Sequence, residues 1–477
     1  MGPPLALVLA AGLGTRMRSR HAKVLHPVLG WPMVRHAVAA CQEAGLEVRL
    51  VVHHQEPQVR EALAGLHVAF SRQEHPRGTG DAVRAALADL PATGTLVVLP
   101  GDAPLLRAQT LTALLDAHQG RLVTCLSVRL PDPAEYGRIV RDGDQLRIVE
   151  AAELVLAGRS EAERAAMDEV NSGVYAFDLA FLHELLPSLQ PHPPKGELYL
   201  TDALAAASAR GGAAVLCHSG DPAEVMGVND RWAMSEAERR LGERLKQAHA
   251  LAGVSFQDPA STRVEVEVLL GQDVLIGPGC VLARGVVLGE GVEVGPHCVL
   301  SRCRVHAGAR ILAHSVVDGA EVGAGAQVGP LARLRPGAVL EADVRVGNFV
   351  EVKQSRIEEG AKVSHLSYIG DARVGAGANV GAGTITCNYD GFGKHHTEIG
   401  AGAFIGSNTA LVAPLRVGVG AIVGAGSTLT ADVPDQALAV ARGAQINRSD
   451  LAPRLRARNQ ALARLHAARS SGEGEPS

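Results

Sequence analysis

The chain has 477 residues, which is too long for one ordinary hydrophobic core, so we expect two large domains or one domain joined to a repeat array. A formal net charge of -4 with 20% charged residues excludes the wrapping of a polyanion as its main activity, and no nucleic acid partner is expected. Glycines crowd after residue 270, where Val, Ile and Leu alternate with small residues. This shift in composition predicts a change of architecture.

The segment from residue 5 to about 225 alternates short β-branched runs with helical patterns, which is typical of an α/β domain with a mainly parallel sheet. Ligands of such sheets bind at the carboxyl ends of the strands, so the loops after Ala10 and Pro100 are the first candidate sites. The pattern predicts strands at Leu5–Ala10, Val48–Val52, Val68–Ser71, Leu96–Pro100 and Leu122–Val128, and helices at Val34–Ala44, ended by Gly45, and Ala82–Leu90.

The second half carries a repeat of six residues. Asp230 to Leu251 predicts one long charged helix that connects the domains. Beyond it, aliphatic residues recur every six positions, and this period differs from the 3.6 of a helix and the 2 of a strand. A hexapeptide period gives one face of a triangular coil per repeat and predicts a left-handed parallel β-helix. The repeated aliphatic residues are Ile276, Leu282, Leu288, Val294 and Leu300, then Val322, Val328, Leu334, Leu340, Val346 and Val352, and after an interruption at Thr386–Glu398 Ile399, Ile405, Leu411, Val417, Val423 and Leu429. Glycine follows many of them where the turn leaves little room for a Cβ, at Gly277, Gly289, Gly295, Gly323, Gly329 and Gly347.

The seven cysteines form no C-x-x-C pair and lie in apolar or glycine-rich patterns, as buried thiols of a reducing compartment do. No span of about 20 apolar residues is present, so we expect a cytoplasmic protein without a membrane partner. The segment from Leu451 to Arg469 has five arginines and no acid, and predicts a solvated, partly helical tail.

The first strand leads into a glycine-containing loop, Leu9-Ala10-Ala11-Gly12-Leu13-Gly14-Thr15-Arg16-Met17, which Lys23 follows. A Rossmann G-x-G-x-x-G needs Gly in place of Met17, and a Walker A loop needs a Gly-Lys-Ser/Thr sequence that is absent. Glycines still let backbone N–H groups approach phosphate oxygens, while Arg16 and Lys23 neutralise charge. The loop therefore predicts a phosphate site.

These residues resemble the opening motif of the sugar-nucleotidyltransferase family, and further motifs follow in the family's order: Gln73 with Gly78-Thr79-Gly80, Gly101-Asp102, Tyr136-Gly137-Arg138-Ile139, Glu150, Asn171-Ser172-Gly173 and Gly227-Val228-Asn229. The resemblance implies that Asp102 and Asn229 hold Mg²⁺, and that Arg16 and Lys23 are catalytic while the phosphate of N-acetylglucosamine-1-phosphate attacks the α-phosphorus of UTP. UTP and UDP-N-acetylglucosamine would bind to Leu9, Ala10, Ala11, Gly12, Lys23, Gln73, Gly78, Thr79, Gly101, Asp102, Gly137, Glu150, Asn171 and Asn229.

Two alternatives and two departures accompany this interpretation. A strand-end Asp102 is also a common helix N-cap, and Asn229 also suits a turn or a cap. Pro100 replaces the family's tyrosine before Gly-Asp, and Ala151-Ala152-Glu153 replaces a His-Lys-Asp run, so the finer substrate contacts are in question.

Polar residues cluster in the β-helix between Asn348 and Tyr389, where stacking needs none of them. With Arg335 they resemble the acetyltransferase motif of hexapeptide-repeat acyltransferases, and from about residue 5 to 445 the chain resembles the bifunctional enzymes of UDP-N-acetylglucosamine synthesis. The resemblance implies that His365, assisted by Glu351, is the base that deprotonates the amine of glucosamine-1-phosphate as it attacks acetyl-CoA. Arg335, Lys353, Tyr368 and Asn379 would bind the sugar phosphate, and Ala382, Asn388, Tyr389, Ser407, Ala425 and Arg442 would border acetyl-CoA.

The resemblance implies a uridyltransferase domain at 1–228 with a Rossmann-like α/β fold, a linker helix at 229–252, a β-helix acetyltransferase domain at 253–450 and a flexible tail at 451–477. Hexapeptide proteins are typically trimers, so a homotrimer is expected. Cys387 is interpreted as a packing thiol rather than a nucleophile, and His395 and His396 as loop residues rather than metal ligands. The rival hypotheses are a uridyltransferase whose β-helix only trimerises it, and a purely structural solenoid.

Overall fold

The computed structural model describes residues 3–12, 14–133, 136–192, 196–218 and 220–470. The chain forms two compact units, Met1–Gly319 and Ala320–Ser477. Leu13 of the predicted phosphate loop and residues 471–477 of the predicted tail lie outside the described residues.

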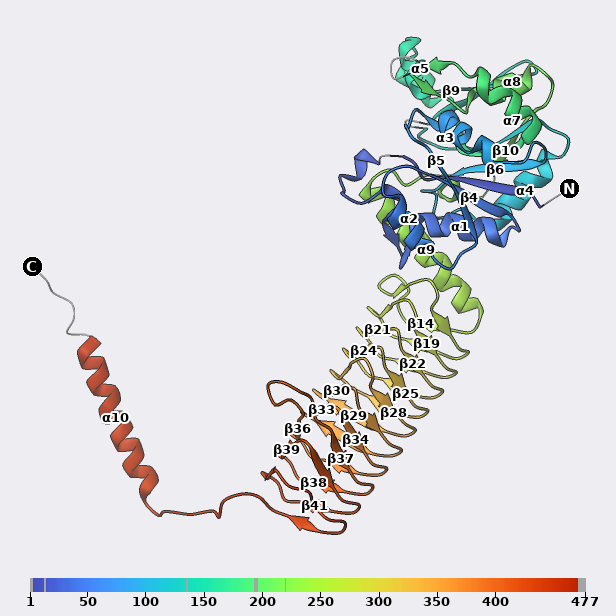
Figure 1. The fold of residues 1–477 in the computed structure, drawn as a ribbon. Coiled ribbons are helices and arrows are strands. Elements are labelled where there is room, and N and C mark those ends of the chain that lie inside the picture. Colours follow the sequence, from blue (N-terminus) through green and yellow to red (C-terminus); the bar gives the residue numbers. More distant parts are fainter. Residues whose placement is uncertain (1–2, 13, 134–135, 193–195, 219, 471–477) are drawn as a thin grey trace, which may run out of the picture. The chain divides into compact units, whose positions relative to one another are not determined.

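The first unit opens with the expected α/β domain (Figure 1). Most of the predicted elements match within a residue or two at each end, while the helix predicted at Ala82–Leu90 begins at Thr79 and finishes as a 3-10 turn. The strands are β1 (Leu5–Leu9), β2 (Pro27–Val28), β3 (Trp31–Pro32), β4 (Glu47–Val52), β5 (Val68–Arg72), β6 (Thr95–Pro100), β7 (Val123–Arg129), β8 (Arg138–Asp142), β9 (Gln145–Val149), β10 (Glu169–Asp178), β11 (Pro191–His192), β12 (Glu197–Leu198) and β13 (Ala213–His218). The helices are α1 (Met33–Glu43), α2 (Glu56–Ala62), α3 (Thr79–Ala86), α4 (Ala108–His118), α5 (Ala151–Leu156), α6 (Glu161–Ala165), α7 (Leu179–Leu185), α8 (Asp202–Ser208) and α9 (Arg231–Leu251), with 3-10 turns η1 (Thr15–Met17), η2 (Lys23–Leu25), η3 (Leu87–Asp89), η4 (Leu186–Ser188) and η5 (Pro222–Val225).

The main sheet runs β13-β7-β10-β6-β1-β4-β5 and is parallel except for β10, which is antiparallel to β6 and β7. Helices cover both faces: α1, α2 and α4 pack with Ala6 and Val8, and α3, α7 and α8 pack with Leu7. Because both faces are buried, the strands are apolar throughout, as in LALVL of β1. The order also places β1 between β6 and β4, so the loop after β1 lies at a point where the order of the strands reverses, which is where open α/β sheets bind ligands.

The long helix α9 confirms the expected charged helix, with Asp230 as its N-cap. Within the first unit its Glu238 accepts a hydrogen bond from the backbone N–H of Leu29, at 3.1 Å, and pairs with Arg263 at 2.7 Å. The Leu29 carbonyl in turn accepts a bond from the N–H of Val266 at 3.0 Å. The helix, the turn between β2 and β3 and the first coil of the repeat region are therefore joined by direct hydrogen bonds.

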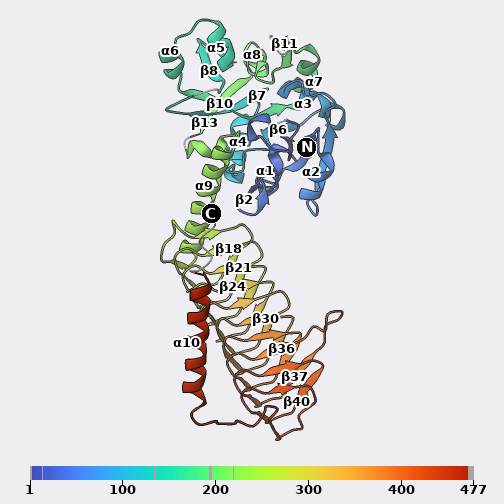
Figure 2. The same cartoon turned by 90° about the vertical axis from the view of Figure 1, so that its left-hand side faces the viewer.

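The repeat region is the predicted left-handed β-helix. Its strands run from β14 (Ser255–Phe256) to β24 (Val316–Asp318) in the first unit, and from β25 (Glu321–Val322) to β43 (Leu438–Ala439) in the second. Within each unit the strands stack in parallel into three sheets, and every third strand of the chain belongs to the same sheet over most of its length. The labels β18, β21 and β24 in Figure 2 mark successive strands of one of these sheets. The aliphatic residues of the six-residue period, such as Ile276 and Val346, are buried.

The glycines of the repeats prove to be required by stacking. A Cβ on Gly277 would lie 2.8 Å from the backbone nitrogen of Pro296 in the next coil, and one on Gly289 would lie 2.8 Å from that of Ala307. A Cβ on Gly347 would overlap the carbonyl oxygen of Ser364. The predicted lack of room for a side chain is confirmed at these positions.

The tail forms the helix α10 (Leu451–Ser470), and its residues are exposed as far as 467. Ala, Leu and Arg have high helix propensity, which accounts for helix formation in a segment with little packing. None of the described helices combines the length and apolarity that a membrane crossing requires.

Candidate active sites

The phosphate loop follows β1 and is held against Lys23. Gly14 has φ +60°, and a Cβ there would lie 2.6 Å from the Cβ of Lys23, so glycine is needed both for the conformation and for the close approach. Ala10 and Ala11 are buried, and the N–H of Ala10 donates to the carbonyl of Val51 at 2.9 Å. Arg16 lies in η1, directly after this loop.

Lys23 meets the predicted metal ligands. Its ammonium group forms an ion pair with the Asp102 carboxylate and donates to Asn229 Oδ1 at 3.2 Å, across 206 positions of sequence. The N–H of Val228 donates to the Asp102 carbonyl at 2.8 Å, and a Cβ on Gly227 would lie 3.2 Å from Asp102 Oδ1. Two hard oxygen donors thus converge on one cationic group, and a carboxylate and an amide oxygen are the donors that suit Mg²⁺.

The residues predicted to contact uracil lie around α3. Gln73 is buried and its Nε2 donates to Asp81 Oδ2 at 2.8 Å. Burial opposes ionisation of Asp81, but the bonds from Gln73 and Arg84 hold its pKa below the usual value. Gly78 has φ +97° and a Cβ there would lie 2.6 Å from the Leu198 carbonyl oxygen. Thr79, which starts α3, accepts a bond from the N–H of Leu200 at 3.2 Å.

The residues predicted around the sugar form a second group. Thr201 Oγ1 donates to Glu150 Oε1 at 3.1 Å, and burial raises the pKa of Glu150. A Cβ on Gly137 would lie 3.3 Å from Glu150 Oε2, and the N–H of Asn171 donates to the Gly137 carbonyl at 2.9 Å. The sequence analysis missed Thr201, because a threonine at a helix start has the same pattern as an ordinary cap.

Glu153, one of the residues that depart from the family pattern, has a structural role. Glu153 accepts a hydrogen bond from the N–H of Glu150 at 3.0 Å and completes a capping box at the start of α5. This bond holds the backbone of Glu150 where α5 begins.

His365 ends the strand β32 (Lys362–His365) and lies opposite Asn348, the last residue of β29 (Arg345–Asn348). His365 Nδ1 is 2.7 Å from Asn348 Oδ1. Because an amide oxygen only accepts, Nδ1 donates in this contact, and in the neutral ring the lone pair then lies on Nε2. An exposed imidazole in this tautomer suits a general base, and the contact with Asn348 was not predicted from the sequence.

The other predicted residues of this cluster lie on neighbouring strands. Glu351 of β30 (Glu351–Lys353) pairs with Arg335 at 2.8 Å and lies opposite Tyr368 of β33 (Tyr368–Gly370). Glu351, predicted to assist His365, thus holds Arg335, while Asn348 bonds to His365. The nearby Lys394 ammonium keeps the pKa of Lys353 below its usual value, which indicates two cations close together.

Asn388 and Tyr389 lie on the loop that interrupts the six-residue repeat. Asn388 Nδ2 donates to Tyr368 Oη at 3.4 Å and to Asp371 Oδ2 at 2.5 Å. His395, on the same loop, pairs with Asp390 at 2.7 Å. In the described part of the chain, no three His, Cys, Asp or Glu side chains are arranged to hold a metal.

Four of the residues predicted to border acetyl-CoA follow one corner of successive coils: Ala382, Ser407, Ala425 and Arg442. The N–H of Asn408 donates to the Ala382 carbonyl at 2.7 Å, the N–H of Gly426 donates to that of Ser407 at 2.8 Å, and Arg442 Nη1 donates to that of Ala425 at 2.8 Å. Asn379 lies apart from this corner, on β35 (Asn379–Val380) next to Lys362 and Phe404. Cys387 is half-buried at the end of β36 (Ile385–Cys387).

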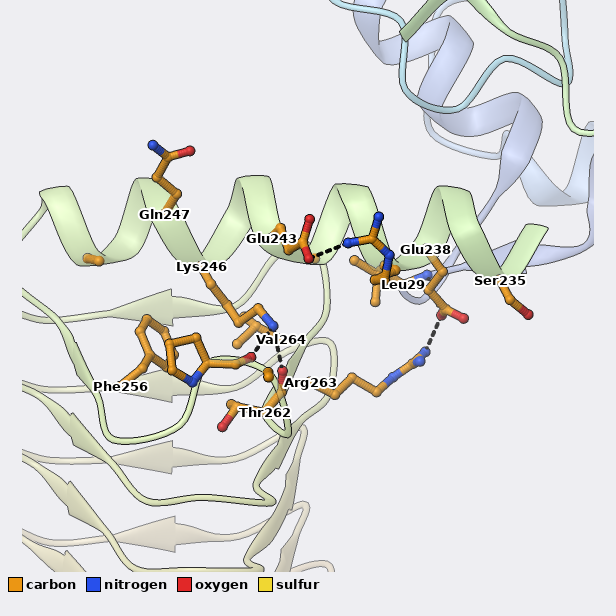
Figure 3. A pocket seen from close by; sticks show the side chains of 15 residues that line it. Leu29, Ser235, Glu238, Glu243, Lys246, Gln247, Phe256, Thr262, Arg263 and Val264 are labelled. Atoms are coloured by element: carbon orange, nitrogen blue, oxygen red, sulfur yellow. Dashed lines mark hydrogen bonds and ion pairs between the residues drawn. The ribbon is translucent and has the colours of Figure 1, made fainter. Parts of the chain in front are cut away.

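Two cavities of the first unit lie outside these clusters. One, of about 700 Å³, lies between α9 and the first coil and is lined by Glu238, Lys246 and Arg263 among others (Figure 3). Lys246 is buried there and donates to the carbonyl oxygens of Pro259 and Thr262. The other, of about 710 Å³, is lined by Arg107, His218, Glu224 and Arg244 among others. Neither cavity contains a predicted site residue.

Two family models match parts of the chain: the MobA-like NTP transferase domain over residues 6–172, and the GMPPB C-terminal domain over residues 264–357. Full-length relatives also match. The bifunctional protein GlmU of Pelobacter propionicus is 43% identical over 450 residues, which covers 93% of this chain and 96% of the relative. Those of Cellvibrio japonicus and Alkalilimnicola ehrlichii are 46% and 48% identical, and each alignment covers 92% of this chain and 97% or 94% of the relative.

Alignments that cover 92–93% of the chain include most of both halves. The hypotheses of a β-helix that only trimerises the enzyme, and of a purely structural solenoid, do not fit relatives that are named bifunctional and are matched over nearly their full length. The chain belongs to the family of bifunctional GlmU proteins, and it is both an acetyltransferase and a uridyltransferase of UDP-N-acetylglucosamine synthesis.

Proposed function

We propose that the chain runs its reactions in the order acetyl transfer, then uridylyl transfer, at the two clusters described. The convergence of Lys23, Asp102 and Asn229 from three distant segments is the observation that carries the assignment of the uridylyl site. The Asn348–His365 pair carries that of the acetyl site. The substrates are small molecules: glucosamine-1-phosphate, acetyl-CoA, UTP and N-acetylglucosamine-1-phosphate.

At the uridylyl site, Asp102 and Asn229 would hold Mg²⁺, which when bound neutralises negative charge on the UTP phosphates. Arg16 and Lys23 stabilise the charge that develops as pyrophosphate leaves. Lys23 is positioned for this role because it already lies against both oxygen ligands. Gln73, Gly78 and Thr79 would bind the uracil end, and Gly137, Glu150 and Asn171 the sugar.

At the acetyl site, the amino nitrogen of glucosamine-1-phosphate forms a bond to the acetyl carbonyl carbon, and His365 Nε2 takes a proton from that amino nitrogen. The carbon–sulfur bond of acetyl-CoA then breaks, and the proton passes to the departing thiolate. Asn348 keeps the proton on Nδ1 so that Nε2 is available. Arg335, Lys353, Tyr368 and Asn379 would hold the sugar phosphate, while Asn388 and Tyr389 lie on the loop beside it.

A homotrimer in the cytoplasm completes the proposal. One sheet of the second unit leaves an apolar column exposed, made of Phe404, Ile422 and Leu438 on successive strands, with 50%, 50% and 69% of each residue exposed. Contiguous apolar surface of this kind is usually buried by association. Sedimentation equilibrium of the intact chain tests the trimer, and a monomer at micromolar concentration would contradict it.

The test of both activities is one incubation with glucosamine-1-phosphate, acetyl-CoA, UTP and Mg²⁺. We expect UDP-N-acetylglucosamine, free thiol and pyrophosphate to appear together. Omitting acetyl-CoA should abolish all three products. Supplying N-acetylglucosamine-1-phosphate in place of glucosamine-1-phosphate and acetyl-CoA should restore pyrophosphate release. If UDP-glucosamine forms without acetyl-CoA, the proposed order is wrong.

A further inference from the structure

One buried carboxylate ties the segment before Asn229 to the segment after Asp102. Glu224, in η5, is 3% exposed. It accepts hydrogen bonds from the N–H of Arg107 at 3.3 Å and from the Thr110 hydroxyl, and it pairs with Arg107 Nε at 3.2 Å. Arg107 is the N-cap of α4 and Thr110 lies in its first turn, so a residue more than 100 positions away caps this helix.

The two segments joined by Glu224 are those that carry the proposed metal ligands. Asp102 lies between β6 and α4, and Asn229 lies between η5 and α9. They also meet directly, since the Val228 N–H donates to the Asp102 carbonyl at 2.8 Å. Glu224 therefore adds a second polar connection between the segments that carry the two ligands.

The two segments also share apolar packing, since Val225 of η5 is fully buried in one core cluster with Leu106 and Leu111. Further polar contacts join them to α9. Asp221 caps η5 and pairs with Arg240 of α9 at 2.8 Å, and Arg244 of α9 donates to the Leu105 carbonyl at 2.9 Å. The cavity of about 710 Å³ adjoins Glu224 and is lined by Arg107, His218 and Arg244 as well. The polar bonds of Glu224 thus join η5 to α4 at the wall of this cavity, beside that apolar packing.

We propose that Glu224 is a positioning residue for uridylyl transfer, which sets the spacing of the Asp102 and Asn229 oxygens and thereby the affinity for Mg²⁺. This inference rests on the proposed role of those two residues. Groups that orient metal ligands typically change metal affinity by about tenfold to 100-fold when removed. Glu224 contacts neither the substrates nor the metal in this arrangement, so its loss should change the metal dependence rather than the chemical step.

The test compares Glu224→Gln, Thr110→Val and, as a matched control, Glu43→Gln, which removes another carboxylate from the wall of the same cavity. Pyrophosphate release is measured against Mg²⁺ concentration, and binding of Mn²⁺ in the presence of UDP-N-acetylglucosamine is followed by electron paramagnetic resonance. For Glu224→Gln we expect the Mg²⁺ concentration at half-maximal rate and the Mn²⁺ dissociation constant both to rise about tenfold, with kcat at saturating Mg²⁺ within about twofold of wild type. Thr110→Val should change both in the same direction, and Glu43→Gln neither.

Circular dichroism and thermal unfolding of the same preparations report whether the α/β domain of each variant is folded. An unchanged Mg²⁺ requirement in Glu224→Gln, or a fall in kcat without loss of Mn²⁺ affinity, would overturn the proposal. If Glu224→Gln fails to fold, Thr110→Val decides by the same criteria. Asp102→Asn separates the two levels of inference: normal Mn²⁺ binding there would refute the metal pair itself, whereas lost binding there and normal binding in Glu224→Gln would refute only the positioning role.

Discussion

The two halves of the chain build their sites in opposite ways. In the α/β domain, Lys23 and Asn229 meet from 206 positions apart. The sheet order brings the ends of β1 and β6 together, and with them Lys23 and Asp102, while the bond from the Val228 N–H to the Asp102 carbonyl brings Asn229 beside them. In the β-helix, Asn348 and His365 are 17 positions apart and meet because one coil stacks on the next. A site of the first kind depends on the whole sheet, and one of the second kind depends on a few adjacent coils.

This difference implies that the two activities can be removed separately. The strongest expected effect is that of His365→Ala, which should lower the kcat of acetyl transfer by about 10³-fold, since a general base contributes about 10²- to 10⁴-fold. Thiol release from acetyl-CoA measures it. Uridylyl transfer from UTP to N-acetylglucosamine-1-phosphate should be unchanged, and loss of both activities in a folded protein would show that the sites are not independent.

The reciprocal change is Asp102→Ala. Removing the carboxylate takes away one of the two proposed metal ligands and leaves Lys23 without its ion pair, so pyrophosphate release should fall by about 10²-fold. Acetyl transfer by the same protein is the control. A variant that keeps its uridylyl activity would show that Asp102 is only a structural residue of the loop.

The coil architecture itself is tested by Gly347→Ala. The added methyl group would overlap the Ser364 carbonyl oxygen, and overpacking of this kind costs about 1–3 kcal/mol. Thermal unfolding of the variant measures the loss, and acetyl transfer should fall with it, because Asn348 is the next residue.

Gly393→Ala is the matched control for the same β-helix, since a Cβ there meets only His395 Nε2, at 4.0 Å. We expect a change in unfolding free energy within about 0.5 kcal/mol. Equal losses in the two variants would mean that coil stacking does not limit the Cβ at position 347.

Among the changes to active-site side chains, the smallest effect is expected for Asn348→Ala. The imidazole of His365 would lose the acceptor that keeps its proton on Nδ1, so kcat of acetyl transfer should fall by about tenfold, well short of the loss in His365→Ala. Steady-state kinetics with saturating acetyl-CoA measure it. A variant as inactive as His365→Ala would assign Asn348 a direct role in the chemistry.

The difference between the two halves also bears on which features of the fold can be predicted from the sequence. The β-helix follows from its six-residue period, since Ile276, Val346 and the other repeated residues are buried as expected and Gly347 has no room for a Cβ. Most of the predicted elements of the α/β domain lie within a residue or two of the observed ones. Local periodicity is sufficient for both results.

Partners in tertiary contacts are harder to predict. Glu224 follows shortly after the turn sequence Gly220-Asp221-Pro222, so it has the pattern of a solvated loop acid. It is nevertheless buried against α4. Glu351 was expected to assist His365, and this role stays a prediction, whereas its bond to Arg335 was not predicted. Such pairings depend on which strands neighbour one another and how the corners of the coils are turned, and single-sequence patterns carry little of that information.

The stacked coils also make the length of the β-helix an adjustable dimension. Each coil is bonded only to the coils directly before and after it, and neighbouring strands lie about 4.8 Å apart. Deleting or duplicating one whole coil in the stretch 275–311 would therefore shorten or lengthen the solenoid by about 4.8 Å while leaving the coils from Arg335 to Arg442 intact. The length of the solenoid is therefore a quantity that changes in discrete steps of one coil.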